Sequence, residues 1–417
     1  MNAARAALIL VVLTAASAGL LAIASRAPLD VRRETSQKGQ TAASLGDRFT
    51  EQQIARAGAY RGPGYLFLAL STALNIAALI VLARGPFERM VERVGAWPGG
   101  WMVHAAILGA ALAILTAVAL TPLGYVRGFA MERAWGLSTQ SAPGWVGDQL
   151  RSMAIGAAVA AVASVAFFGV VRWQPRTWWV WGWGTFSVLT LVFVLIWPVV
   201  VAPLFNNFTP LQDASLSRRV KDIAREAGVE IDRVLVADAS RRTTAENAYV
   251  AGLGSTKRMV LYDNLLASGD EAETMFVVAH ELGHEAESHV VKNVLLSSLG
   301  LLIGFAVLAA LATRTWVWSW SGASGVGDLR ALPVLLLFAT VAGIVLLPVE
   351  TAISRNFESR ADEIAISLTQ APDVAVRTFR RLAFSNLSDL RPPRAAVLLL
   401  YTHPPTQERI RAVLGGP

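Results

Sequence analysis

The chain of 417 residues is apolar and weakly charged, with 54% hydrophobic and only 16% charged residues. Soluble domains carry about 25% charged residues, so this composition excludes a simple soluble enzyme, and it equally excludes a disordered chain. The net charge is +7 without a dense Lys/Arg run, which favours charged membrane-flanking loops over a nucleic-acid partner, and the absence of cysteine excludes disulfides and thiolate chemistry.

Seven charge-poor stretches are each long enough to cross a bilayer, since a hydrocarbon core of ~30 Å needs about 20 apolar residues in a helix. They are 6–25, 62–83, a stretch centred on 101–119, 152–171, 177–204, 293–313 and 331–349. All 13 tryptophans lie outside 206–291, and many flank the predicted spans, as an interfacial belt does. The first stretch has an alternative interpretation as a cleaved signal peptide.

These spans divide the chain into four regions: 1–204 with five spans, a polar region 205–291, a region 292–353 with two spans, and a second polar region 354–417. Two spans separate the polar regions, so both lie on one membrane face and can form one site.

Short regular elements are expected in the first polar region. The pattern predicts a helix over 211–227 and strands over 233–238, 247–252 and 258–263. A capping sequence, Ser268-Gly-Asp-Glu271, predicts the start of a helix that runs towards Val290.

Three of the five histidines fall on this last helix, in His280-Glu281-Leu-Gly-His284 and at His289. Histidines four apart lie on one helical face, where both imidazoles can reach one Zn²⁺ at ~2.0–2.1 Å. Glu281 lies beside them, placed to take a proton from a water that the zinc activates. A pair of surface histidines is the alternative, but the concentration of a scarce residue on one capped helix favours a zinc site.

A catalytic zinc needs a third protein ligand. His289 is excluded on spacing, because HExxHxxGxxH places its third histidine ten residues after the first and a continuous helix would turn His289 about 140° from the second; a supporting role is expected. Glu358 and Asp362 lie four apart on a predicted helix, and either is a candidate ligand with the other orienting a histidine. Ordinary pairing with Arg355 and Arg360 is the alternative.

Several motifs follow one another in a recognisable order. They are Pro203-Leu-Phe-Asn-Asn-Phe-Thr-Pro-Leu211, Asn247-Ala-Tyr249 with Gly252 and Gly254, the HExxH helix with His289, Glu358-Ser-Arg-Ala-Asp362, and Tyr401-Thr-His-Pro-Pro-Thr-Gln-Glu-Arg409. In this order they resemble the CAAX prenyl protease 1 family of seven-span membrane zinc metalloproteases.

The resemblance implies a mainly α membrane protein, in which seven transmembrane helices enclose a chamber and a gluzincin-like zinc protease domain contains a small β-sheet. It implies one Zn²⁺ per chain. The implied ligands are His280, His284 and Glu358, with Asp362 supporting them.

The resemblance also implies substrate contacts. A strand with Asn247, Ala248 and Tyr249 pairs with the extended substrate, which suits a protease. His403 is implied to stabilise the oxyanion or protonate the leaving amine, and Arg409 to bind substrate or brace the site. The alternatives are a turn role for Asn247 and a helix-start role for the sequence after His403.

The predicted function is an integral membrane zinc metalloendopeptidase that acts on peptide or protein substrates near the membrane, including membrane-embedded or lipidated ones, with C-terminal CAAX-type processing. The composition is rich in Ala, Arg and Gly, which is typical of bacteria, and bacteria generally lack protein prenylation. Quality control on unprenylated substrates, as in the heat-shock membrane protease HtpX, is therefore one alternative. A transporter or receptor with a structural zinc is another, but structural zinc usually has four protein ligands.

Lysine and arginine counts predict the orientation. Short loops on the zinc face carry ten of these residues, seven of them within 26–61, against eight on the opposite face. The positive-inside rule then places the zinc site in the cytoplasm, at a bacterial plasma membrane surrounded by membrane lipids. Cleavage of the first span as a signal peptide would invert this orientation.

Overall fold

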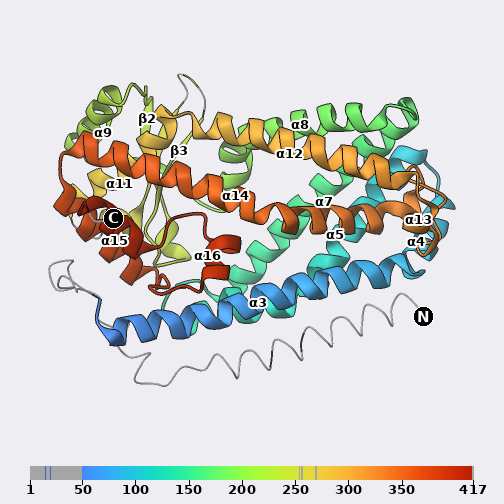
Figure 1. The fold of residues 1–417 in the computed structure, drawn as a ribbon, viewed down its shortest axis with the longest axis horizontal. Coiled ribbons are helices and arrows are strands. Elements are labelled where there is room, and N and C mark those ends of the chain that lie inside the picture. The colour runs from blue at the N-terminus through green and yellow to red at the C-terminus, as the bar shows by residue number, and fades with distance from the viewer. Residues whose placement is uncertain are drawn as a thin grey trace.

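The computed structural model describes residues 49–252, 254, 257–267 and 270–415, together with positions 15 and 19. Long helices form one half of the described chain, and a small sheet with shorter helices forms the other (Figure 1). The helix α14 (Leu332–Thr369) belongs to both halves. Its 38 residues span about 57 Å at 1.5 Å each, roughly twice the thickness of a bilayer core, so its C-terminal part extends well beyond the membrane.

Six helices in the described part are long and apolar enough to cross a membrane. They are α3 (Glu51–Ala83), α5 (Trp101–Tyr125) continued to 134, α7 (Ala142–Trp173), α8 (Trp178–Ile196) continued to 204, α12 (His289–Ala312) and α14. They match the second to seventh predicted spans, which are thereby confirmed as apolar helices of spanning length. The first predicted span, 6–25, lies outside the described residues except at positions 15 and 19, so a count of seven is not established.

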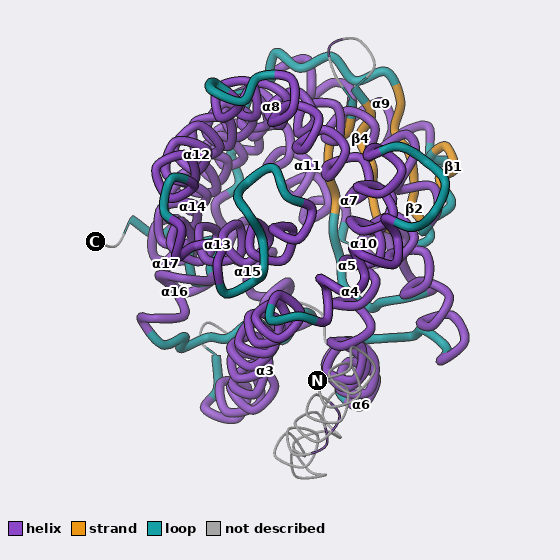
Figure 2. Tube along the Cα trace, turned by 90° about the vertical axis from the view of Figure 1, so that its right-hand side faces the viewer, coloured by secondary structure: helices purple, strands orange, loops and turns teal. Residues whose placement is uncertain are grey.

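The membrane helices bury little of their apolar surface against one another. The buried share of the most apolar window is 28% in α3, α5 and α7, and falls to 6% in α8. Viewed along the long axis of the molecule, α3, α8, α12 and α14 lie at the periphery (Figure 2). Such helices present apolar surface on more than one side.

Short segments connect or continue these helices. They are α4 (Pro86–Gly95), a π-helical segment Val126–Met131, α6 (Glu132–Ala134), a π-helical segment Trp197–Val201, a 3₁₀ turn Ala202–Leu204, α13 (Thr315–Ser319) and a 3₁₀ turn Leu329–Ala331. The helices α4 and α13 lie at the end of the molecule away from the sheet (Figure 1).

The sheet has four strands in the order β1-β2-β4-β3. Their bounds are β1 (Phe208–Pro210), β2 (Arg233–Ala237), β3 (Ala248–Ala251) and β4 (Arg258–Tyr262). The central pair β2–β4 is parallel, and β1 and β3 each join antiparallel, which makes β3 an edge strand. The three predicted strands are found within one residue of their expected starts and ends; β1 was not predicted.

Helices pack around this sheet to form the core of the second half. They are α9 (Ala214–Glu226), α10 (Asp263–Ala267), α11 (Glu271–Ala286), α15 (Pro372–Ser385), α16 (Arg394–Leu400) and α17 (Thr406–Val413), with a 3₁₀ turn at Ala239–Arg241. The core includes Val278 and Leu282 of α11 and Met259 and Leu261 of β4, each fully buried. Phe276 meets Phe379 of α15 edge to face, so α11 is held on both sides.

Two expectations about α11 are wrong. The helix does not continue to Val290: it ends at Ala286, Ser288 adopts a left-handed backbone with φ 55°, and α12 begins at His289. Its N-cap is Asp270, whose side chain accepts a hydrogen bond from the Glu273 amide, rather than Ser268. The predicted helix over 211–227 is confirmed but starts at Ala214, because the Asp213 side chain caps it.

Candidate metal centre and active site

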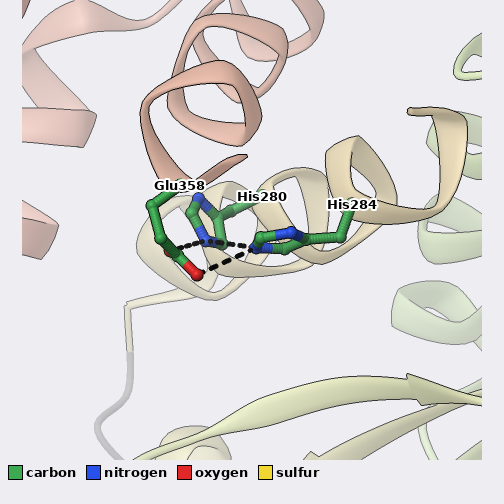
Figure 3. A group of neighbouring side chains, drawn as sticks. All are labelled: His280, His284 and Glu358. Atoms are coloured by element: carbon green, nitrogen blue, oxygen red, sulfur yellow. Dashed lines mark hydrogen bonds and ion pairs between the residues drawn. The ribbon is translucent and has the colours of Figure 1, made fainter. Parts of the chain in front are cut away.

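The helix α11 carries the HExxH sequence at the centre of the second half of the molecule. Its first turn is capped by Asp270, and ten of its residues from Glu273 to Gly283 are buried. His280 is 8% exposed, and His284, one turn later, is partly exposed. Both imidazoles point from the same helical face (Figure 3).

A glycine lets α14 approach this face closely. A Cβ at Gly283 would lie 3.0 Å from Ala361 Cα and 3.1 Å from its carbonyl oxygen. Contacts this short are tighter than most Cβ contacts in proteins, so a larger residue would force the two helix backbones to shift apart. The contact lies between the two histidines and brings Glu358 of α14 to them.

Three donor atoms converge where the helices meet. His280 Nε2 lies 3.2 Å from Glu358 Oε2 and 3.2 Å from His284 Nε2, and His284 Nε2 lies 3.5 Å from Glu358 Oε1 (Figure 3). All three side chains offer a ligand atom within 4.8 Å of the others. Ligands at ~2.05 Å from one metal in tetrahedral geometry are ~3.3 Å apart, so the observed spacings fit a single ion.

His280 is oriented from behind by a carboxylate. Its Nδ1 lies 2.9 Å from Asp362 Oδ1, and Arg409 donates to the same carboxylate, from Nε at 2.8 Å and from Nη2 at 2.6 Å. The Arg409 guanidinium also lies 4.0 Å from the centre of the Phe379 ring. With a proton on Nδ1 directed to Asp362, the Nε2 lone pair faces the other donors.

Burial and neighbouring charges shift the pKa values of His280 and Glu281 in the motif. Burial lowers the pKa of His280, but hydrogen bonds to Asp362 and Glu358 outweigh it and raise the pKa to about 9. A metal ion that enters must therefore displace a proton from this group of donors. Burial raises the pKa of the Glu281 carboxyl, and the two histidines beside it oppose that rise.

His289 lies next to the donor group without belonging to it. Its Nδ1 is 2.8 Å from His284 Nδ1, and its ring stacks on Phe357 at 4.2 Å. The residue is 3% exposed. The exclusion of His289 as a ligand and its expected supporting role both stay predictions. The angle given for it was wrong, since α11 ends before it and no continuous helix fixes its position.

His403 reaches the donor group from another segment, while Glu281 on α11 lies close enough to His280, His284 and Glu358 to feel their charges. His403 precedes α17, and its Nε2 lies 3.1 Å from Glu358 Oε2, while Nδ1 lies 3.0 Å from Thr402 Oγ1. Its side chain is 54% exposed. Glu281 makes no hydrogen bond or ion pair with the rest of the described chain, so its carboxylate is available to a reactant.

The predicted substrate strand is β3. Asn247 precedes it, with its carbonyl accepting from the Tyr262 amide at 3.0 Å. Ala248 is 2% exposed in the core and Tyr249 is paired with Val260 of β4. The opposite edge of β3 pairs with no described strand, so its backbone can add an extended peptide.

Two sets of contacts around the site were not predicted. Along one face of α14, Thr351 donates to the Leu398 carbonyl at 2.6 Å and Arg355 Nη1 donates to the carbonyls of Val397 and Tyr401 at 2.7 and 2.9 Å. These bonds hold the segment that leads to His403. The spacing of positions 351, 355, 358 and 362 along one helical face was the signal in the sequence.

The second set joins β3 to α11. The buried Arg381 guanidinium of α15 donates to Glu246, which directly precedes Asn247, and to Glu273 in the first turn of α11. One arginine thus ties the entry of the edge strand to the helix that carries the histidines. Nothing in the sequence spacing could have indicated this, because the three residues come from distant segments.

Membrane-spanning helices joined to an HExxH helix with a converging carboxylate define an integral membrane metallopeptidase. The family model for peptidase family M48 matches residues 210–415, and a model described as CAAX prenyl protease N-terminal, five membrane helices, matches 32–207. The chain belongs to peptidase family M48, and its N-terminal membrane region matches the model of the CAAX prenyl proteases.

Individual relatives support membership of this family. The chain is 33% identical to an uncharacterized metalloprotease, YhfN, of Bacillus subtilis, over 72% of this chain and 71% of the relative. It is 29% identical to CAAX prenyl protease 1 of Saccharomyces cerevisiae, over 72% and 70% of the two chains. Its fold matches that of S. mikatae Ste24p with a TM-score of 0.78 at 22% identity, covering 98% of this chain and 99% of the other.

These findings settle the class of the protein. It is a membrane metallopeptidase that acts on peptides or proteins, and the alternative of a transporter or receptor with a structural zinc is set aside.

Proposed function

We propose that this protein is a zinc endopeptidase in which His280, His284 and Glu358 hold one Zn²⁺. The observation that carries the proposal is the convergence of two imidazoles and one carboxylate at mutual spacings of 3.2–3.5 Å. Two neutral nitrogen donors with one carboxylate are a donor set typical of catalytic zinc. Asp362 and His289 support the ligands, since each contacts the outward ring nitrogen of one histidine.

The side chains around the donor group have separate roles in peptide hydrolysis. When bound, zinc supplies Lewis-acid polarisation of the scissile carbonyl and of the attacking water. Glu281 takes a proton from that water and later delivers it to the leaving amide nitrogen. His403, exposed above Glu358, donates a hydrogen bond to the carbonyl oxygen as negative charge develops there.

Substrate is held as an added strand. An extended peptide pairs with the free edge of β3, through backbone groups of Asn247, Ala248 and Tyr249, so recognition there reads backbone rather than side chains. Arg409, bound to Asp362, braces the site rather than meeting substrate, because its guanidinium is committed to that carboxylate.

The substrate class is a protein C-terminus of CAAX type, delivered at the membrane. Relatives named CAAX prenyl protease 1 support this class. The family resemblance implies a chamber between the membrane helices, and an interior open to water would let a substrate tail reach the site.

The protein resides in a bacterial plasma membrane with the site facing the cytoplasm. The excess of Lys and Arg in short loops on the zinc face supports this orientation. A reporter fused after Pro417 tests it: cytoplasmic fluorescence without phosphatase activity is expected, and periplasmic phosphatase activity would invert the assignment.

The decisive test of the enzyme mechanism is Glu281→Gln. The purified variant should keep its zinc and lose peptidase activity by a factor of roughly 10²–10⁴, the usual contribution of a general base. Glu271→Gln, on the exposed first turn of the same helix, is the matched control and should retain activity. Unchanged activity in Glu281→Gln would remove Glu281 from the mechanism.

A second test addresses the substrate. Prenylated and unprenylated CAAX peptides are offered to the active protein and to Glu281→Gln, and cleavage sites are read by mass spectrometry. Cleavage of the prenylated peptide alone supports CAAX processing. Cleavage of many unprenylated membrane proteins, seen as new C-termini in the membrane proteome, would favour quality control instead.

A further inference from the structure

A cavity of about 400 Å³ lies beside α14, α16 and α17, and four arginines line it. They are Arg355, Arg391, Arg394 and Arg411, and this set is named the arginine pocket. Glu408 is the one carboxylate that lines it. The remaining lining residues are uncharged, so the cavity concentrates positive charge.

Most of this charge lacks a carboxylate partner in the described chain. Arg391 pairs with Glu51, but Arg355 bonds only to backbone carbonyls, through Nη1 alone. Arg394 and Arg411 make no hydrogen bond or ion pair with the described residues. Guanidinium groups without a carboxylate partner are suited to bind a phosphate or carboxylate ligand, since their planar N–H groups match its oxygens.

The pocket begins just beyond the apolar part of α14, next to where the headgroups of a surrounding membrane would lie. The apolar run of α14 ends at Val349, and Thr351, two residues or ~3 Å further along the axis, bonds to the Leu398 carbonyl of α16. Arg355 lies six residues, or ~9 Å, beyond Val349. A headgroup layer occupies roughly 5–8 Å on each side of the hydrocarbon core, and arginine side chains extend into such a layer.

The surface beside the pocket is apolar where acyl chains would begin. Leu398, which lines the pocket, is 51% exposed, and Leu399 is 36% exposed. Exposed leucines next to arginines are typical of a segment that lies in the membrane interface. A soluble anion would use the arginines but would gain nothing from the leucines.

We propose that the arginine pocket binds an anionic phospholipid of the surrounding membrane. Arg394 and Arg411 hold the phosphate, Arg355 adds its remaining N–H groups, and the acyl chains begin over Leu398 and Leu399. The helix α16 ends at Leu400, three residues before His403, so a bound lipid also steadies the segment that carries His403. Lipid binding itself does not depend on the proposed peptidase mechanism.

The test measures lipid retention on the purified full chain in detergent by native mass spectrometry, with phosphatidylglycerol and phosphatidylcholine as probes. Wild type should retain phosphatidylglycerol in preference. The double variant R394Q/R411Q should retain it at least tenfold less, because each lost charge-assisted hydrogen bond weakens binding about tenfold. The matched control R218Q/R233Q removes the same charge from exposed positions of α9 and β2 and should behave as wild type.

Three outcomes would overturn the proposal. Equal retention in R394Q/R411Q and wild type would show that the pocket is not the site, and equal loss in both double variants would reduce the effect to general surface charge. Displacement of the lipid by equimolar inorganic phosphate would reduce the site to an anion site without lipid specificity. If R394Q/R411Q melts earlier than wild type, the single variants R394Q, R411Q and R394K give the answer, with R394K expected to retain more lipid than R394Q.

Discussion

Removal of the Asp362 carboxylate is expected to weaken metal binding although all three proposed ligands remain in the chain. Asp362 is 7% exposed and lies 2.9 Å from His280 Nδ1, with two further hydrogen bonds from Arg409. In Asp362→Ala, His280 loses the group that fixes its tautomer and ring orientation. Loss of such a partner costs about 10–100-fold in metal affinity, or ~1.4–2.7 kcal/mol.

The same substitution also affects folding. It leaves the Arg409 guanidinium, whose side chain is 15% exposed, without its carboxylate, and breaking a buried pair in this way costs ~3–5 kcal/mol of unfolding free energy. Asp362→Asn keeps one carbonyl oxygen as an acceptor, so both losses should be smaller. The two effects separate in the assays: metal affinity is measured by competition with a chelator at fixed pH, and stability by thermal unfolding of the metal-free protein.

The matched control is Glu363→Gln. Glu363 is the next residue on α14, its side chain is 64% exposed, and it pairs with Arg360 one turn earlier. An exposed pair of this kind is worth ~0–1 kcal/mol, so both metal affinity and melting temperature should stay near wild type. If Asp362→Ala binds metal within twofold of wild type while remaining folded, Asp362 does not orient His280 and the proposed support for the ligands is refuted.

Three further outcomes are expected. Glu358→Ala should lose bound zinc in elemental analysis, whereas His289→Ala should keep it, because His289 contacts a ligand but lies outside the donor group. Gly283→Ala should lower the melting temperature and the metal content, since the new Cβ forces α11 and α14 apart at a cost of ~1–3 kcal/mol. Single cysteines introduced along 188–196 of α8, in a chain with no cysteine of its own, should react with a polar thiol reagent along one helical face if the interior is open to water.

Each of these has a clear contrary result. Equal zinc loss in Glu358→Ala and His289→Ala would make His289 a ligand, either in place of Glu358 or together with it. Gly304→Ala is the control for the glycine change, because a Cβ at this position meets nothing within 4 Å. Equal melting temperatures of Gly283→Ala and Gly304→Ala would show that the contact of α11 with α14 does not require glycine. Uniform protection of the cysteines would indicate a sealed bundle.

Local sequence was sufficient for the membrane helices and the HExxH helix. Apolar runs of about 20 residues specify a spanning helix whatever surrounds them, because the bilayer requires every backbone hydrogen bond to be satisfied within the segment. The histidine spacing within one helix is equally local. Six of the predicted spans and three predicted strands are therefore present in the structure.

Tertiary structure was needed for the third member of the donor group. Spacing left Glu358 and Asp362 equivalent, and the family resemblance, rather than the residues themselves, favoured Glu358. The structure brings Glu358 to both histidines and turns Asp362 to the far nitrogen of His280. That difference follows from the close approach of α11 and α14 at Gly283, which sequence periodicity does not encode.

Local helix propensity also failed to predict the turn after α11. The residues from Glu287 to Val290 carry no proline or glycine that would stop a helix, so a continuous helix was the natural prediction. The chain breaks instead at Ser288, and α12 starts in a new direction towards the membrane. The helix α11 packs against the sheet, whereas α12 crosses the membrane, so the two helices need different directions. The residues that fix those directions lie far from both helices in sequence.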